Sequence, residues 1–166
     1  GTDKEYKAKL DVILDAPLSG RWDFSQGAKQ LIDEGLVERS VQTISPFISE
    51  ESSELNLGLQ REKRWFYPIE AVREVLVNAL VHRDWTRFVD IEIGIYSDRF
   101  EVISPGSLQN SMTVAKMLAG QRYTRNTVIM EVMRDYGYVD FRGMGLRTKV
   151  VPLMRSHNGC DPIFEA

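Results

Sequence analysis

The stretch YPIEAVREVLVNALVHRD, residues 67–84, predicts a helix that is apolar around most of its circumference. Pro68 suits the first turn of such a helix, because proline lacks an N–H that a first turn leaves unpaired anyway. At about 100° per residue, Glu74, Asn78 and His82 are displaced by only about 40° at each step, so they form one narrow polar stripe. Hydrophobic residues border the stripe on both sides, which is typical of a helix buried on most faces rather than of a surface helix.

The polar stripe needs partners, because a buried amide or carboxylate without a hydrogen bond costs about 1–3 kcal/mol. One interpretation is structural: Glu74 and Asn78 bond to neighbouring loops, and His82 is a satisfied core histidine. The other interpretation is functional, with the stripe facing a ligand. The helix alone leaves both interpretations open.

Three further segments supply groups that suit a phosphate and its metal. They are a glycine-bearing loop after a predicted hairpin, the segment QRYTRN before a predicted helix, and a glycine pair that opens the last helix. The residues concerned are Ser104, Gly106, Arg122, Arg125, Asn126, Gly143 and Gly145. Each feature alone has a common structural explanation. Together with the polar stripe, they predict an anion-binding site built from a helix face, two glycine loops and a helix N-terminus.

Composition limits the classes of protein that the chain can belong to. Its 166 residues, 43% of them hydrophobic, fit one globular domain with a substantial core. A net charge of -3 argues against a nucleic-acid-binding surface that extends over the whole domain. The single cysteine, Cys160, excludes an internal disulfide and a cysteine-based zinc site. Because no run of about 18 apolar residues occurs, we expect no membrane span and a cytoplasmic location.

The order of predicted elements indicates an α+β fold, because strands and helices are mixed without a βαβ rhythm. Alternating apolar residues on both sides of Ser97-Asp98 predict a hairpin with strands at 89–95 and 100–103. The other expected elements are helices at 3–10, 23–35, 113–118, 127–136 and 146–155, a loop at 41–54, and strands at 55–60 and 162–165. We expect a single domain, 1–166, in which residues 1–60 frame a motif-bearing core at 61–166. The missing initiator methionine and the short C-terminal end lead us to expect a fragment of a longer protein.

The motifs occur in an order that resembles a known family. The stretches YPIEAVREVLVNALVHRDW, IEIGIYSDRFEVISPGSL, TRNTVIMEVMRDYGYVDFRGMGLR and PIFE resemble transcriptional regulators of the RecG-related C-terminal family, which carry a divergent GHKL (gyrase, histidine kinase, MutL type) ATPase-like domain. The resemblance covers roughly residues 15–166 and is densest from residue 66 onward. It implies the two-layer Bergerat fold, a mixed sheet covered by helices on one face. The sequence has no GxxxxGK[ST] phosphate loop, so the resemblance does not extend to a helicase motor.

The resemblance also implies a nucleotide site with ATP and Mg²⁺ as cofactors. Glu74 then takes the position of the general base that orients the attacking water, and Asn78 that of the Mg²⁺ ligand. Gly143 and Gly145 match a glycine box whose backbone amides receive phosphate. The implied cofactor-binding positions are Asn78, His82, Ser104, Gly106, Arg122, Arg125, Asn126, Gly143 and Gly145.

The sequence departs from the family pattern in its first glycine loop. Ser104 replaces the aspartate that reads the adenine amino group, and Leu108 replaces the second glycine. A hydroxyl can bond a base directly or through water, but it offers no charge-assisted acceptor. The segment 107–142 is compact and helical, without an obvious long lid over the nucleotide. We therefore expect slow hydrolysis or none.

Two functions of different classes follow from the sequence. The first is a nucleotide-binding module that acts as a switch in a bacterial or archaeal regulator. The second is a scaffold or dimerisation domain of a DNA-associated regulator that has lost the nucleotide. DNA contact is expected only of flanking domains, and a homodimer is left open.

For Glu74, Arg125 and Asn126 the sequence leaves a structural and a functional interpretation open. Arg125 and Asn126 either form an internal clamp or contact phosphate. Glu74 is either a base or a buried partner of Arg125. The HRD at 82–84 is not a kinase catalytic loop, because that loop requires an asparagine where Val89 stands.

Overall fold

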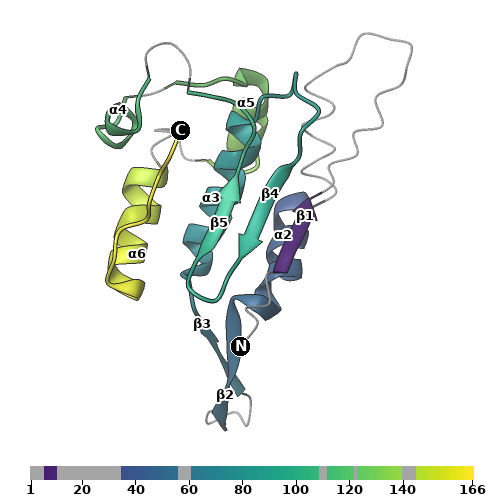
Figure 1. Cartoon of the computed structure of the whole chain (residues 1–166), viewed down its shortest axis with the longest axis vertical. Coiled ribbons are helices and arrows are strands. Elements are labelled where there is room, and N and C mark those ends of the chain that lie inside the picture. Colours follow the sequence, from purple (N-terminus) through teal and green to yellow (C-terminus); the bar gives the residue numbers. More distant parts are fainter. Residues whose placement is uncertain (1–5, 11–34, 56–60, 109–111, 122, 140–144) are drawn as a thin grey trace, which may run out of the picture.

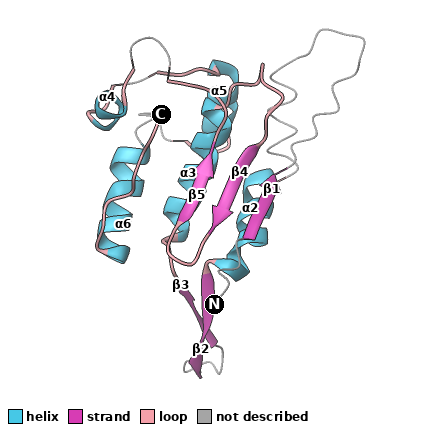
Figure 2. Ribbon diagram, in the orientation of Figure 1, coloured by secondary structure: helices cyan, strands magenta, loops and turns pink. Residues whose placement is uncertain are grey.

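A three-stranded antiparallel sheet forms one layer of the computed structural model. The structure describes residues 6–10, 35–55, 61–108, 112–121, 123–139 and 145–166. Strand β1 (Tyr6–Leu10) pairs with β4 (Ile91–Ile95), which in turn pairs with β5 (Phe100–Ile103). The registers Tyr6↔Ile95 and Ile95↔Phe100 place β4 in the centre. Figure 2 shows this sheet with helices behind it.

Helices cover one face of the sheet and enclose the core. They are α2 (Leu36–Ile44), α3 (Ile69–His82) and α5 (Thr127–Asp135). Figure 1 shows α3 and α5 behind β4 and β5, and α2 behind β1. Two further helices, α4 (Val114–Leu118) and α6 (Val151–Asn158), lie at the side of the β5 edge. A short turn, η1 (Ser45–Phe47), follows α2, and a π-helical turn, η2 (Leu146–Val150), leads directly into α6.

Helix α3 is central because it contributes to both hydrophobic clusters. Val77, Leu80 and Val81 pack with Ile91 of β4 and with buried residues of α5. On its other side, Val72 and Leu76 pack with Ile93 and Ile95 and with buried residues of α2. This double packing explains why the helix is apolar around most of its circumference. The predicted helix is confirmed. It begins at Ile69, one residue after Pro68, and ends at His82.

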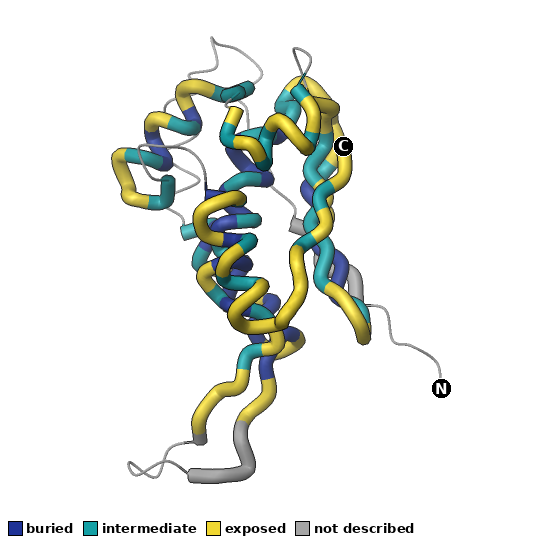
Figure 3. Tube along the Cα trace, turned by 90° about the vertical axis from the view of Figure 1, so that its left-hand side faces the viewer, coloured by how far each residue is buried: buried dark blue, intermediate teal, exposed yellow. Residues whose placement is uncertain are grey.

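A second, two-stranded sheet projects from the body of the domain. Strands β2 (Ser49–Leu55) and β3 (Arg61–Trp65) pair antiparallel, with Glu50 opposite Arg64. We call this pair the β2–β3 ribbon. Both Figure 1 and Figure 3 show it standing away from the two layers, and its described side chains from Glu62 to Arg64 are exposed.

The α+β class is confirmed, as are the hairpin β4–β5 and the helices α4 and α5. The expected mixed sheet is antiparallel in every pairing between described strands. No helix in the described part of the chain is long and apolar enough to cross a bilayer.

Three predicted elements are wrong. The expected helix at 3–10 is an edge strand at Tyr6–Leu10, because pairing with β4 outweighs the local charge pattern. The expected loop at 41–54 consists of the end of α2 and most of β2. Residues 162–165, expected as a strand, have no regular structure. The predicted helix at 23–35 and strand at 55–60 fall mostly outside the described residues.

Three hydroxyl side chains of α2 and the start of β2 bond to backbone carbonyls of their own turn. Ser40 Oγ donates to Leu36 O at 2.6 Å, and Thr43 Oγ1 donates to Arg39 O at 2.7 Å, both within α2. Ser49 Oγ donates to Ser45 O at 2.6 Å where the ribbon begins. Such bonds to the carbonyl four residues earlier satisfy the hydroxyl groups locally, so these polar residues are accommodated within regular structure.

Candidate functional site

Within the polar stripe of α3, Glu74 is buried and Asn78 and His82 are partly buried, and Asn78 bonds to Glu74. Only 6% of Glu74 is exposed. Asn78 Nδ2 donates to the Glu74 backbone oxygen at 3.3 Å and to Glu74 Oε1 at 3.2 Å. Because the amide nitrogen is used in this way, Asn78 presents its side-chain oxygen as the remaining acceptor.

The cation that pairs with Glu74 comes from the last helix. Lys149 Nζ lies 3.3 Å from Glu74 Oε2, and half of the lysine side chain is exposed. The ion pair therefore lies at the edge of the buried carboxylate, where solvent weakens it. Arg125, which the sequence also suggested as a partner of Glu74, pairs with Asp84 instead.

Gly145 closes over the same carboxylate. A Cβ on Gly145 would lie 1.6 Å from Glu74 Oε1 and 2.2 Å from Glu74 Cδ. Its φ of -55° is ordinary, so glycine is required here for space and not for backbone conformation. The start of the last helix thus packs directly on Glu74.

His82 lies at the C-terminal end of the stripe. Burial lowers the pKa of His82 below its usual value, and the nearby Arg125 cation lowers it further. The imidazole is therefore neutral at pH 7, with one nitrogen able to donate and the other able to accept.

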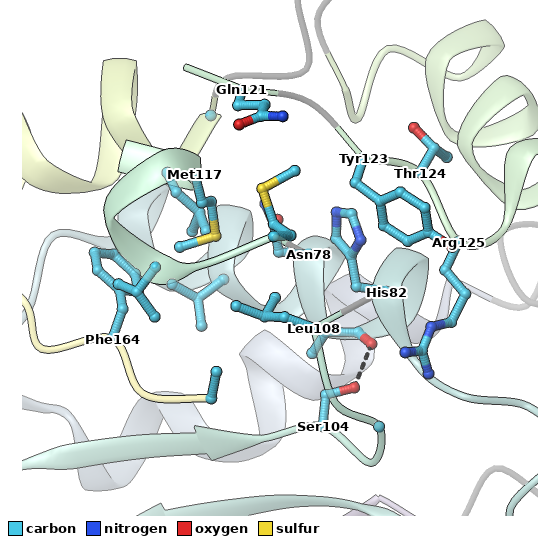
Figure 4. Close-up of a pocket in the computed structure, with 18 of the residues that line it drawn as sticks. Asn78, His82, Ser104, Leu108, Met117, Gln121, Tyr123, Thr124, Arg125 and Phe164 are labelled. Carbon is cyan, nitrogen blue, oxygen red and sulfur yellow. Dashed lines mark hydrogen bonds between the residues drawn. The ribbon is translucent and has the colours of Figure 1, made fainter. Parts of the chain in front are cut away.

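The loop after β5 is bound to the end of α3. Ser104 Oγ donates to Ala79 O at 2.8 Å, the contact drawn in Figure 4. Asp84 N donates to Pro105 O at 2.8 Å. The hydroxyl proton of Ser104 is used in the first contact, so towards a ligand this oxygen can act only as an acceptor.

Gly106 is required by both conformation and space. Its φ of +124° lies in a region that side chains rarely adopt. An added Cβ would also lie 2.2 Å from Arg125 Nη1. Arg125 is held across this glycine by an ion pair with Asp84, Nη1 to Oδ2 at 3.3 Å, and by a bond from Nη2 to Ser107 O.

Asn126 caps α3 instead of facing a ligand. Its Nδ2 donates to Val81 O at 2.6 Å and to Arg83 O at 2.8 Å. Both carbonyls belong to the end of the helix, where no backbone donor follows. Arg125 and Asn126 therefore make the contacts expected of an internal clamp. Arg83 is also structural, because it donates to Val89 O at 2.8 Å and stacks on Trp85.

A cavity of about 380 Å³ lies between α3, the loop after β5, α4 and η2. The residues predicted from the sequence that line it are Asn78, His82, Ser104, Gly106, Arg125 and Gly145. Glu74 and Asn126 do not line it. Arg122 and Gly143 lie outside the described residues. Figure 4 shows Asn78, His82, Ser104 and Arg125 around this one space. Segments far apart in the sequence are thus brought together around one cavity.

The cavity wall includes residues that the sequence did not single out. Met117, Tyr123 and Phe164 provide apolar and aromatic surface, and Phe164 comes from the segment that was expected to be a strand. Arg134 and Arg147 add positive charge. Because Arg125 is already paired with Asp84, the excess of positive charge that favours an anionic ligand rests on Arg134 and Arg147, against Glu165. Arg147 follows Gly145 by two residues, at the start of the predicted last helix. This position could have identified it from the sequence as a candidate phosphate ligand.

The described side chains would need a ligand or water to complete a metal site. Among the described residues, no group of three or more histidine, cysteine, aspartate or glutamate side chains could hold a metal ion. Mg²⁺ is often held by one or two protein oxygens together with phosphate oxygens and water. The Asn78 oxygen suits that arrangement, since Asn78 lines the cavity and its amide nitrogen is already bonded.

Three comparisons with known proteins were informative to different degrees. Residues 89–166 match a family model described as "Putative ATP-dependent DNA helicase recG C-terminal". The match begins after α3, so it does not include Glu74, Asn78 or His82. No curated protein matches the chain.

One solved structure is similar to the chain. It is the crystal structure of the DIP2311 protein from Corynebacterium diphtheriae, with 24% sequence identity and a TM-score of 0.48. The similarity covers 73% of this chain but only 23% of that protein, so the chain spans less than a quarter of its length. The family model is the more informative finding: the C-terminal part of the chain, residues 89–166, is similar to the RecG-related, ATPase-like family.

Proposed function

We propose that the chain is a divergent nucleotide-binding module that takes ATP with Mg²⁺ and acts as a nucleotide-responsive switch in a transcriptional regulator. The observation that supports this most is the cavity, because six of the residues predicted for the nucleotide line it together. Its size falls within the range of ligand pockets, about 300–1,000 Å³. The match of residues 89–166 to an ATPase-like family supports the same class of ligand.

The polar and apolar halves of the cavity suit the two ends of a nucleotide. Met117 and Phe164 offer surface for a base, and Ser104 Oγ offers an acceptor to an exocyclic amino group. Arg147 and the backbone at Gly145 offer donors to phosphate. When bound, Mg²⁺ would neutralise phosphate charge, with Asn78 as its ligand from the protein.

Hydrolysis is proposed to be slow or absent. A general base must reach the attacking water directly or through one further water. Glu74, the residue in the base position, is 6% exposed, is paired with Lys149 and does not line the cavity. The carboxylate stabilises the wall behind the ligand instead of facing the ligand.

The alternative is a scaffold or dimerisation domain that has lost the nucleotide. Two contacts favour this alternative, because they already occupy polar groups of the site. Ser104 donates to Ala79 O, and Glu74 is paired with Lys149. These bonds occupy the Ser104 hydroxyl and the Glu74 carboxylate without any ligand, as expected of a domain that has lost the nucleotide.

Thermal denaturation with a non-hydrolysable ATP analogue and Mg²⁺ separates the two. The proposed module gains stability with rising ligand concentration, by about 2.7 kcal/mol at 100 times the Kd. Asn78→Ala abolishes the Mg²⁺-dependent part of this gain, whereas Thr43→Ala, on the exposed side of α2, leaves it intact. No stabilisation of the full-length protein at millimolar nucleotide would establish the scaffold instead.

A further inference from the structure

The last helical segment contacts the cavity at one end and the β2–β3 ribbon at the other. At its start, Gly145, Leu146 and Arg147 line the cavity. At its end, His157 Nε2 lies 2.8 Å from Trp65 O, and Asn158 Nδ2 donates to Phe66 O at 2.8 Å. Trp65 is the last residue of β3, so these bonds hold the root of the ribbon. Figure 1 shows α6 running alongside α3 towards that root.

The cavity end of this segment is closely packed and cannot be displaced independently of the helix. Gly145 lies against the Glu74 carboxylate with no room for a methyl group, and Lys149 is paired with the same carboxylate at 3.3 Å. A ligand that contacts Gly145 or Arg147 therefore acts on the helix itself. The contacts with α3 set one position of the helix when no ligand is bound.

The turn between the two ends has an unusual geometry. Residues Leu146–Val150 form a π-helical turn, and α6 follows it without interruption. Such turns are rare and occur often at functional sites. Pro152, in the first turn of α6, has no N–H with which to bond the preceding turn. A π turn and an α turn of the same residues would orient the following helix differently, so this turn is a point at which the direction of α6 can change.

We propose that the segment Gly145–Asn158 couples the occupancy of the cavity to the position of the β2–β3 ribbon. This rests on the proposed function, since a nucleotide is the ligand that would act at Gly145 and Arg147. His157 and Asn158 are positioning residues in this scheme: they hold the backbone of Trp65 and Phe66 and do not touch the ligand. The ribbon stands away from the body in Figures 1 and 3, so a small rotation at its root displaces its whole length.

Hydrogen exchange measured by mass spectrometry tests this coupling in the full-length protein. Exchange at residues 61–67 is compared with and without a non-hydrolysable ATP analogue and Mg²⁺. The reference is the parent chain, and the test variant is His157→Ala combined with Asn158→Ala. Arg155→Ala is the matched control, because Arg155 lies on the same turn but pairs with Asp161 and not with the ribbon. Calorimetry on the same samples reports nucleotide affinity.

We expect the analogue to change exchange at 61–67 by at least about fivefold, the lower end of ordinary coupling between sites. The change is lost in the double variant and kept in Arg155→Ala, while nucleotide affinity in the double variant shifts by no more than the coupling factor. If the analogue binds but exchange at 61–67 does not change in the parent, the coupling is refuted and the nucleotide site stands.

The coupling can also be judged if no nucleotide binds, which would refute the proposed function. Gly145→Ala forces the start of the segment and the Glu74 carboxylate apart without any ligand. The milder Lys149→Met removes the ion pair between the segment and the same carboxylate. It replaces Gly145→Ala in the experiment if that variant does not fold. In either variant, faster exchange at 61–67, absent from Arg155→Ala, supports the coupling. Exchange identical to the parent in both variants refutes it.

Discussion

Replacing Gly145 with alanine should destabilise the domain through one contact, the one with Glu74. The φ of Gly145 is -55°, so alanine meets no backbone strain. The new Cβ would lie 1.6 Å from Glu74 Oε1 and 2.2 Å from Cδ, whereas non-bonded carbon atoms pack at about 3.5–4.0 Å. Either the helix or the carboxylate must therefore move by more than 1 Å.

The expected cost follows from these contacts. Overpacking by one methyl group typically costs about 1–3 kcal/mol. Displacing the carboxylate from Asn78 and Lys149 adds about 1 kcal/mol, a low value because the lysine is half exposed. Urea denaturation should thus show a free energy of unfolding lower by about 2–4 kcal/mol.

A double-mutant cycle tests whether Glu74 is the cause. Glu74→Ala removes the atoms that collide with the new methyl group, so Gly145→Ala should cost at least about 1 kcal/mol less in that background. The control pair, Gly145→Ala with Arg155→Ala, should be additive, because Arg155 lies near the other end of α6. Additive costs for Gly145→Ala and Glu74→Ala would contradict the packing described for the two residues.

Three further predictions concern the cap, the serine loop and pH. Asn126→Ala should lower the free energy of unfolding by about 2 kcal/mol in urea denaturation, because it removes two bonds to the α3 terminus; a loss under 0.5 kcal/mol would show that water replaces the amide. Ser104→Ala should cost about 1 kcal/mol for the bond to Ala79 O and should weaken binding of an ATP analogue more than that of a nucleotide without an exocyclic amino group, as measured by calorimetry; equal weakening would place the base elsewhere. The pKa of His82 is lower in the folded chain than its usual 6.5, so its contribution to stability is complete above about pH 6.5 and is lost as the pH falls through the folded value. Denaturation curves should therefore show a smaller decline over this range in His82→Gln than in the parent, and identical declines would contradict the burial of His82.

Periodicity predicted best where burial and local pattern agree. The helix α3 and the hairpin β4–β5 are visible in the sequence because both lie in the core and their apolar residues repeat at 3.6 and 2 residues. The polar stripe was also correctly recognised as needing partners. Its partner Lys149 could not be identified, because the two residues are 75 positions apart and only tertiary packing brings them together.

The polar elements at the periphery were mispredicted for a different reason. Strand β2 has the sequence SEESSEL, which lacks an apolar face and is stabilised by pairing with β3. Single-sequence patterns do not show such pairing. Asn126 illustrates the same limit in the site, since its cap on α3 joins residues more than 40 positions apart. Strand β1 is a different case: its sequence YKAKL alternates apolar and charged residues, and the helix expected at 3–10 overlooked this period of two.

The most direct test of the account is a crystal structure of the protein with a non-hydrolysable ATP analogue and Mg²⁺ at millimolar concentration. The account predicts one nucleotide in the cavity, with its base near Ser104, its phosphates near Gly145 and Arg147, and Mg²⁺ on the side-chain oxygen of Asn78. Glu74 should still face Lys149. An empty cavity, or a nucleotide bound at another place on the domain, would contradict the proposed site.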